Sequence, residues 1–358
     1  MMAGKRGIAI AGTHGKTTTT TMASLILSKA GLSPSYIIGG FSQQLGRNAA
    51  AGQSDLLVLE ADEYDRTFLS LTPEISVITN IEWDHPDCYP TEADYQQVFV
   101  DFAKKTTTPQ NLIVCGDDAG VRQLCEQFPQ AQSYGLETHN QWQATDIMLN
   151  QEGGYRFHIQ HNGQVVTEHP ISLAVPGKYN LRNALGAIIA SYTVGVPISD
   201  AGRILATFQN PKRHFELKGV INGITVIDDY AHHPTEISVN LAAAKDKFGT
   251  RPIWAVFQPH TFTRTQTLLS DFAQAFTDAD HVILLDIFSS AREKDDGTIG
   301  SGDLLNQMHH HDAQHIGAMS DAVRYLRTHL TAGDVLITFG AGDGYKVGES
   351  ILEQGLVG

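Results

Sequence analysis

Residues 7–27 read GIAIAGTHGKTTTTTMASLIL, and this stretch decides the class of fold. A strand-like apolar run leads through a glycine-containing turn into a segment whose apolar residues indicate a helix. A strand, a glycine turn and a helix in this order form a phosphate-binding loop, where backbone N–H groups and the helix N-terminus face anionic oxygens. The candidate nucleotide-binding residues of this loop are Gly12, Thr13, His14, Gly15, Lys16, Thr17 and Thr18.

Lys16 and Thr17 give the predicted loop its chemistry. In a phosphate loop the lysine reaches the β- and γ-phosphates, and the hydroxyl of the next residue joins the Mg²⁺ shell. Ile10 stands where the strict motif has its first glycine, so a chance GKT at the start of a threonine-rich helix is the alternative. The run Thr17–Thr21 is poor helix-forming material, which favours a segment kept for ligand binding.

Acidic residues end the next two predicted strands. EADEYD (60–65) follows one apolar run, and Asp84 and His85 follow another. Ligands of parallel sheets bind at the carboxyl ends of strands, and carboxylates are ligands that Mg²⁺ prefers. These residues predict a metal site beside the loop. The alternatives are a solvated acidic loop and a structural histidine.

The rest of the chain alternates between β-branched runs and amphipathic segments, which is typical of an α/β protein with a mostly parallel sheet. The Asn-Gly turn at 162–163, inside residues 131–175, predicts an antiparallel addition to that sheet. The alternation restarts after residues 211–213, so we expect two domains. The other expected elements are strands at 56–62, 75–81, 111–117, 223–230, 252–259, 281–288 and 334–342, and helices at 92–105, 179–194, 234–248, 264–277, 320–330 and up to 355, with a polar loop at 289–303.

Composition excludes several classes of protein. The 358 residues contain 25 Lys+Arg and 39 Asp+Glu, and a net charge of −14 disfavours general nucleic-acid binding. The sequence lacks the apolar run of about 18 residues that a membrane span needs, and its start lacks a signal-peptide core. A cytoplasmic location is therefore expected. Cys88, Cys115 and Cys125 form no CxxC pair and are expected to be reduced, buried thiols.

Six segments together resemble the Mur ligases, the ATP-dependent amide ligases of peptidoglycan precursor synthesis. They are AGTHGKTTTT (11–20), LEADEYDRTFL (59–69), TNIEWDH (79–85), PGKYNLRNALGA (176–187), DDYAHHPTEI (228–237) and FQPHTFTRT (257–265). The resemblance is strongest to members that join L-alanine to the carboxylate of UDP-N-acetylmuramate through an acyl phosphate. One alternative is a member that adds a tripeptide to the same sugar nucleotide. The other is an ATP-binding module that is inactive without a further domain.

The resemblance implies a fold, two cofactors and a set of binding residues. The fold is a P-loop ATPase-type, mostly parallel sheet domain over residues 1–211, followed by a Rossmann-like α/β domain over 212–358. The cofactors are ATP and Mg²⁺, with Thr17 and Glu60 as metal ligands and His85 as the ligand of a second Mg²⁺. For the nucleotide, the matches are Asn180 and Asn183 near the adenine, Arg213 at the phosphates, and Asp228 or Asp229 at the ribose.

The resemblance also assigns ATP to the first domain and the amino acid to the second. Tyr230, His232, His260 and Arg264 match positions around the muramoyl carboxylate and the incoming amino acid. An amine attacks only as a neutral nucleophile, so a nearby base takes its proton, and His232 or His260 is a candidate. In the family a nucleotide-sugar-binding domain usually precedes the phosphate loop, and we expect this chain to lack it. A separate N-terminal domain supplied in trans is therefore an expected partner.

Three further segments carry weaker predictions. GAGDG (340–344) is similar to a dinucleotide loop, but Tyr345 stands in the place of the third glycine, so a turn capped by Asp343 is predicted. His309–His311 are expected in a solvated helix end or loop. Residues 291–294 are expected either to border the substrate cleft or to form a plain surface loop.

Overall fold

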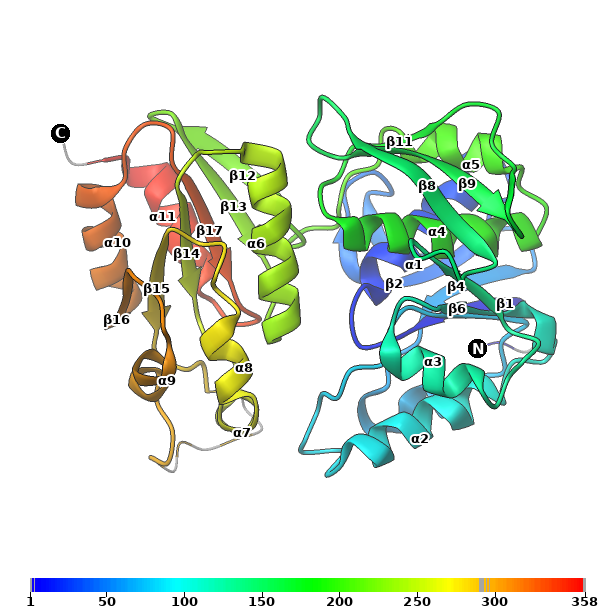
Figure 1. Ribbon diagram of the computed structural model, residues 1–358, viewed down its shortest axis with the longest axis horizontal. Helices are drawn as coiled ribbons and strands as arrows, with labels where there is room; N and C mark the ends of the chain where they lie inside the picture. The colour runs from blue at the N-terminus through cyan, green and yellow to red at the C-terminus, as the bar shows by residue number, and fades with distance from the viewer. Residues whose placement is uncertain (1, 3, 290–292, 294, 296, 357–358) are drawn as a thin grey trace. The chain divides into compact units, whose positions relative to one another are not determined.

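The computed structural model describes residues 2, 4–289, 293, 295 and 297–356. Ala291, Arg292 and Lys294, from the segment predicted as a cleft border or a surface loop, lie outside the described residues. The chain forms two compact units, Met1–Pro211 and Lys212–Gly358. Each unit has a sheet covered by helices (Figure 1), so the predicted α/β fold class is confirmed.

Eleven strands form the sheet of unit 1 among the described residues, in the order β10-β9-β8-β7-β6-β5-β1-β4-β2-β3, with β11 paired to β9. The strands from β8 to β2 in this order are parallel. The pairs β8–β9, β9–β10, β9–β11 and β2–β3 are antiparallel. The strands are β1 (Arg6–Ala11), β2 (Ser35–Ser42), β3 (Arg47–Ala50), β4 (Leu56–Glu60), β5 (Ile75–Ile78), β6 (Leu112–Cys115), β7 (Gln132–Gly135), β8 (Trp142–Leu149), β9 (Tyr155–His161), β10 (Gln164–Val165) and β11 (Ile171–Leu173).

The central strand β1 is buried on both faces, as expected for a parallel sheet covered by helices. Ile8 and Ile10 belong to the core cluster shared with α1, α4 and α5, whereas Ala9 and Ala11 belong to the opposite cluster with α2 and α3. The carboxyl end of β1 is therefore held firmly inside the unit. The helices are α1 (Lys16–Lys29), α2 (Glu92–Ala103), α3 (Ala119–Cys125), α4 (Lys178–Thr193) and α5 (Ile198–Leu205), with 3₁₀ helices η1 (Tyr64–Ser70) and η2 (Pro109–Asn111).

The antiparallel addition to the sheet is confirmed. Asn162 and Gly163 have φ values of 50° and 79° and connect β9 to β10, as the Asn-Gly signal predicted. The strands β2 and β3 and the helices α3 and α5 were not predicted from the sequence. The strand β2 contains the pair Gly39-Gly40, and glycine weakens the strand signal because it has no side chain to pack.

The prediction of three buried thiols is wrong for two of them. All three cysteines are free, but only Cys115 is buried, while Cys88 and Cys125 are partly exposed. Among the described residues, the structure contains no helix that is both long and apolar enough to span a membrane.

Unit 2 contains a six-stranded sheet in the described part of the chain, in the order β12-β13-β17-β14-β15-β16. All neighbours are parallel except the edge strand β12, which is antiparallel to β13. The strands are β12 (Glu216–Ile221), β13 (Ile224–Asp229), β14 (Ile253–Phe257), β15 (His281–Leu285), β16 (Ala313–Gly317) and β17 (Val335–Phe339). The helices are α6 (Pro234–Phe248), α7 (Phe262–Thr267), α8 (Leu269–Gln274), α9 (Ser301–Gln307), α10 (Met319–His329) and α11 (Tyr345–Gln354).

Several local predictions for unit 2 need correction. The helix expected at 264–277 is divided into α7 and α8 at Leu268, whose φ and ψ of −104° and 22° depart from helical values. The strands β12 and β16 and the helix α9 were not predicted from the sequence. Asp343 does not cap α11, because the N-cap residue is Gly344, and the Asp343 carboxylate instead accepts hydrogen bonds from Gln258 and Lys346.

Candidate functional site

The turn between β1 and α1 presents the N-terminus of a buried helix. Gly15 is the N-cap residue of α1, has φ of 81°, and no side chain caps the helix in the part of the chain that the structure describes. The first-turn N–H groups of such a helix attract anions. A Cβ atom at Gly15 would lie 2.5 Å from Oδ1 of Asn183, so α4 packs directly against the loop. Asn183 Nδ2 in turn donates to Asn180 Oδ1 at 3.2 Å, which places both predicted asparagines in one hydrogen-bonded unit.

The Lys16 ammonium lies inside the loop. Its Nζ atom donates to the carbonyl oxygens of Gly12 at 2.6 Å and Thr13 at 3.0 Å, and to Glu63 Oε1 at 3.0 Å. Burial alone would lower the pKa of Lys16, but the negative charges of Glu63 and Glu60 outweigh it, and the pKa is raised above its usual value. Lys16 is therefore a charged cation in this site, as binding to phosphate requires.

Thr17 and Glu60, both predicted metal ligands, lie together. Thr17 Oγ1 donates to Glu60 Oε1 at 3.0 Å, and the backbone N–H of Gly39 donates to Glu60 Oε2 at 2.7 Å. Gly39 lies on β2, so a strand that the sequence analysis missed fixes one of these ligands. A hydroxyl and a carboxylate at a helix N-terminus are oxygen donors that fit Mg²⁺.

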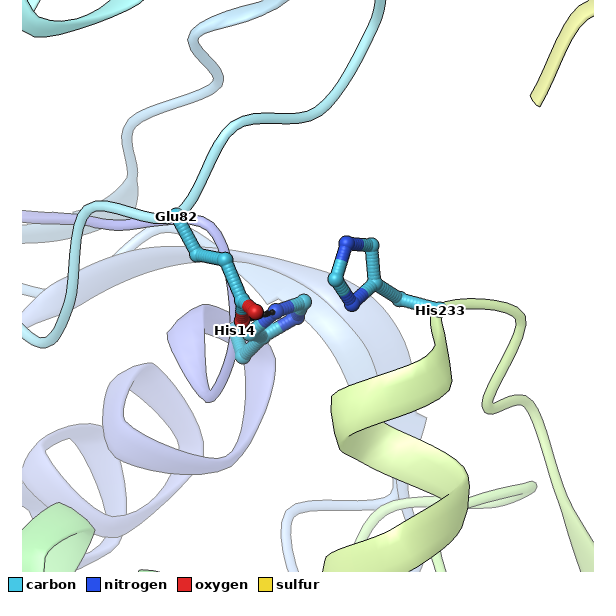
Figure 2. Close-up of side chains that lie close together, drawn as sticks. All are labelled: His14, Glu82 and His233. Carbon is cyan, nitrogen blue, oxygen red and sulfur yellow. Dashed lines mark hydrogen bonds and ion pairs between the residues drawn. The ribbon is translucent and has the colours of Figure 1, made fainter. Parts of the chain in front are cut away.

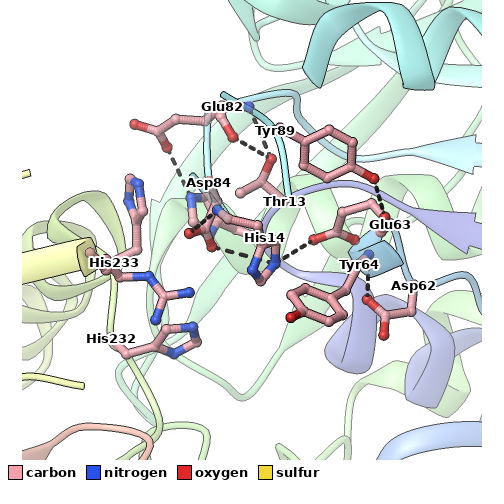
Figure 3. A network of polar contacts seen from close by, with 12 residues as sticks. Thr13, His14, Asp62, Glu63, Tyr64, Glu82, Asp84, Tyr89, His232 and His233 are labelled. Carbon is pink, nitrogen blue, oxygen red and sulfur yellow. Dashed lines mark hydrogen bonds and ion pairs between the residues drawn. The ribbon is translucent and has the colours of Figure 1, made fainter. Parts of the chain in front are cut away.

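His85, the third predicted metal ligand, lies beside a carboxylate that the sequence analysis did not select. Its Nε2 atom is 3.3 Å from Glu63 Oε1 and 3.7 Å from Asp84 Oδ2. Figure 3 shows the Tyr89 hydroxyl pointing at the main chain of Glu63, where it donates to the carbonyl oxygen. The sequence alone does not distinguish Glu63 from the other acids of EADEYD (60–65), and in the structure Glu63 is the N-cap residue of η1.

The segment after β5 holds the outer part of the loop. The Thr13 hydroxyl donates to the Glu82 carbonyl at 2.8 Å and accepts from the Glu82 N–H at 3.0 Å. Figure 2 shows the His14 ring directed at the Glu82 carboxylate, with 2.9 Å between Nε2 and Oε2. The His14 N–H donates to Asn80 Oδ1 at 2.8 Å. The loop conformation is therefore fixed by the TNIEWDH segment as well as by its own glycines.

Arg213 and Asp228 form an ion pair in unit 2, in which Asp228 is buried and Arg213 is partly exposed. Arg213 Nε donates to Asp228 Oδ2 at 2.9 Å, and its Nη2 atom donates to the Gly340 carbonyl at 2.7 Å. The guanidinium lies over the rings of Tyr230 and Tyr345, at 5.0 and 4.7 Å from their centroids. Within unit 2, Arg213 thus connects the start of the unit to the loop after β17.

Asp229 is a buried carboxyl at the end of β13. Its Oδ2 atom accepts from the Phe215 N–H at 2.6 Å, and Oδ1 accepts from the Ala231 N–H at 2.7 Å. Burial raises the pKa of Asp229 to about 8, although these two N–H bonds oppose the shift. Its two oxygens fix the segment that leads to His232.

The residues predicted around the amino acid gather within unit 2. The ring centroids of His232 and His260 are 6.3 Å apart, and Tyr230 packs edge-on against His232 at 5.3 Å. Arg264 is buried, and its Nη1 atom lies 3.5 Å from the His260 carbonyl oxygen. The backbone N–H of His232 donates to Glu236 Oε2 at 3.1 Å. Unit 2 therefore brings two imidazoles, a phenol and a guanidinium into one cluster.

A phosphate loop with a partly buried lysine, carboxylate and hydroxyl oxygens beside it and a second α/β unit define a nucleotide-binding enzyme of two α/β units. The sequence matches the Mur ligase middle domain over residues 10–191 and the Mur ligase, glutamate ligase domain over residues 213–342. The chain belongs to the Mur ligase family, as its motifs predicted.

Individual relatives agree with this assignment. The chain is 41% identical to a UDP-N-acetylmuramate–L-alanine ligase of Roseiflexus castenholzii, over 98% of this chain and 76% of the relative. It is 39% identical to the ligase of the same name from Caldanaerobacter subterraneus, with the same coverage. The crystal structure of UDP-N-acetylmuramate-alanine ligase MurC from Thermotoga maritima matches with a TM-score of 0.80 and 25% identity, over 98% of this chain and 75% of that one. A murein peptide ligase from Psychrobacter arcticus matches with a TM-score of 0.71 and 26% identity, over 100% and 79%.

Proposed function

We propose that this chain is an ATP-dependent ligase that joins L-alanine to the carboxylate of UDP-N-acetylmuramate in peptidoglycan precursor synthesis. The observation that carries the proposal is the partly buried Lys16 ammonium in a phosphate loop, beside the Thr17–Glu60 pair, in a chain about 40% identical to ligases of that name. Amide formation from a carboxylate requires activation. Phosphoryl transfer from ATP supplies it as an acyl phosphate, which the amine then attacks.

Unit 1 supplies the groups that bind the nucleotide. Lys16 and the first-turn N–H groups of α1 face the phosphates, while Asn183 supports the loop from α4. Thr17, Glu60 and His85 would hold the Mg²⁺ ions that neutralise the charge on the transferred phosphoryl group. The proposal also places Asn180 and Asn183 near the adenine and Arg213 at the phosphates. It assigns the ribose to Asp228 or Asp229.

Unit 2 supplies the groups that bind the amino acid in this proposal. The buried Arg264 guanidinium offers a cation for a carboxylate, and Tyr230 lines the same cluster. His232 or His260 takes the proton from the alanine ammonium, so that the neutral amine can attack the acyl phosphate.

The direct test is ADP release in the presence of ATP, Mg²⁺ and UDP-N-acetylmuramate. Release that depends on L-alanine supports the proposal, and the substitution Lys16→Met should abolish it because the phosphates lose their buried cation. A chain that binds ATP but shows no alanine-dependent ADP release would instead be an ATP-binding module. This conclusion requires that release is also absent after a nucleotide-sugar-binding domain is added.

Addition of a tripeptide to the same sugar nucleotide is the second candidate function, because the murein peptide ligase of Psychrobacter arcticus matches the whole of this chain. Sequence identity favours L-alanine as the amino-acid substrate, because this chain is 41% identical to an L-alanine ligase and 26% identical to the peptide ligase. The same ADP assay with tripeptide in place of L-alanine separates the two candidates. Turnover with tripeptide alone would refute the alanine proposal.

A separate N-terminal nucleotide-sugar-binding domain supplied in trans stays a prediction. The chain spans 76% of the length of the Roseiflexus castenholzii relative. Adding the purified nucleotide-sugar-binding domain of that relative should increase alanine-dependent ADP release if such a partner is used. No change would contradict the prediction.

A further inference from the structure

The carboxylate of Glu63 lies beneath the phosphate loop with 1% of its side chain exposed. Its Oε2 atom is 2.9 Å from Lys16 Nζ, and its Oε1 atom is 3.3 Å from His85 Nε2. Figure 3 shows the Tyr89 hydroxyl beside Glu63, to whose carbonyl oxygen it donates. A charge this deeply buried needs a counter-charge, which Lys16 provides here, and the His85 ring lies beside the carboxylate.

Lys16 has no N–H group to spare for a phosphate while it is paired with Glu63. Its three N–H groups are matched by three acceptors, namely Gly12 O at 2.6 Å, Thr13 O at 3.0 Å and Glu63 Oε1 at 3.0 Å. The two carbonyls belong to the loop that would surround the phosphate. Glu63 is therefore the acceptor that a phosphate oxygen replaces.

The neighbouring carboxylates have other partners. Glu60 accepts hydrogen bonds from Thr17 and from the Gly39 N–H, and Glu82 interacts with His14. The acceptor that competes directly with a phosphate oxygen for the ammonium is therefore Glu63.

We propose that Glu63 is a positioning residue that competes with phosphate for Lys16 and thereby makes nucleotide binding depend on a divalent cation. The inference rests on the proposed ATP-dependent function and deepens it. When a phosphate takes the Lys16 ammonium, the buried Glu63 carboxylate loses a counter-ion close to a second anion, which is unfavourable. A divalent cation held beside His85 restores the balance of charge, so nucleotide and cation bind more tightly together than separately.

The test is calorimetric titration of ADP into the full chain, once with EDTA and once with Mg²⁺. The substitution Glu63→Gln removes the competing charge and keeps the shape of the side chain. We expect Glu63→Gln to bind metal-free ADP about tenfold more tightly than the wild type does. The increase in ADP affinity on adding Mg²⁺ should be about tenfold smaller than in the wild type. A merely structural role would weaken ADP binding under both conditions, so the direction of the change distinguishes the two roles.

A matched control is Glu74→Gln. Glu74 pairs with Arg6 at 2.8 Å, at the end of β1 that is opposite the loop, and this variant should bind ADP as the wild type does in both titrations. Metal-free ADP affinity that is unchanged or lower in folded Glu63→Gln protein overturns the proposal.

A second variant keeps the test decisive if Glu63→Gln does not fold. Glu63→Asp retains the charge for His85 but withdraws the carboxylate from Lys16 by one methylene group, and should tighten metal-free ADP binding about threefold. No tightening in this variant also overturns the proposal. The titrations contain neither sugar nucleotide nor alanine. Absence of ligase turnover would therefore refute the proposed function without deciding the role of Glu63.

Discussion

Substitution of Gly15 by alanine tests whether the nucleotide site depends on contact between the loop and α4. An alanine at φ of 81° has an unfavourable left-handed backbone, which costs about 1–2 kcal/mol. The new Cβ atom would also lie 2.5 Å from Asn183 Oδ1, whereas ordinary contacts begin at 3.4 Å, so one of the two must move by 3.4 − 2.5 = 0.9 Å. Asn183 is 5% exposed and bonded to Asn180, so it has little room to move.

The displacement of Asn183 adds a second loss to the backbone strain. Breaking the bond between Asn183 Nδ2 and Asn180 Oδ1 in a buried site costs about 1–3 kcal/mol. The total for Gly15→Ala is therefore about 2–5 kcal/mol of unfolding free energy. Because the loop and α4 separate, the affinity for ADP should also fall, by about tenfold or more.

Gly31→Ala is the matched control at the other end of the same helix. Gly31 has φ of 84°, and an added Cβ atom would have no neighbour within 4 Å. This variant should lose only the backbone cost of about 1–2 kcal/mol and should bind ADP as the wild type does. Urea unfolding and calorimetric titration of ADP measure both quantities. Equal losses of stability in the two variants, with equal affinity for ADP, would refute the reasoning.

Three further substitutions test other parts of the two units. Glu60→Gln removes a charge from the predicted metal ligands, so the Mg²⁺ concentration needed for half-maximal ADP release should rise about tenfold. Asp229 has a pKa of about 8 when folded and 3.8 as its ordinary value, so only the folded state holds its proton between these values. In urea unfolding, the free energy of unfolding of the wild type relative to that of Asp229→Asn should therefore be highest below pH 4. It should fall by up to about 1.4 kcal/mol per pH unit towards pH 8. A difference between the two proteins that does not change with pH would contradict this prediction. The Thr20 hydroxyl is buried and lacks a hydrogen-bond partner among the described residues, so Thr20→Val should stabilise the chain by about 1 kcal/mol in thermal unfolding. The control Thr21→Val removes a 2.7 Å hydrogen bond to the Thr17 carbonyl oxygen and should not stabilise the chain.

The phosphate loop could be predicted because its chemistry is local in the sequence. The residues Gly15, Lys16 and Thr17 follow one another, between an apolar strand and a helix whose later residues, from Met22 to Leu27, are mostly apolar. Glu60 was also predictable, because it is the last residue of a buried parallel strand that pairs with β1. For these residues, position in the chain determines position at the edge of the sheet.

Glu63 could not be selected from the sequence in the same way. Its place beneath Lys16 depends on how the chain turns after β4, where Asp65 and Arg66 adopt φ values of 52° and 56° that non-glycine residues rarely take. The acidic run EADEYD (60–65) does not indicate which carboxylate points into the interior of the unit. The partner of Glu60 on β2, Gly39, was equally hidden, since pairing between distant strands is not encoded in either strand alone.

The threonine-rich start of α1 connects stability to function. Residues Thr18–Thr21 have 5% exposure or less, and the helix continues into Met22, Leu25 and Ile26 inside the larger core of unit 1. Their intrinsic preference for a helix is poor, so tertiary packing, rather than propensity, keeps this first turn helical. Because packing holds residues Thr18–Thr21 in the core, the backbone N–H groups at the start of α1 keep their positions before any nucleotide arrives. Preorganisation of this kind means that binding does not have to order the loop, so more of the contact energy contributes to affinity.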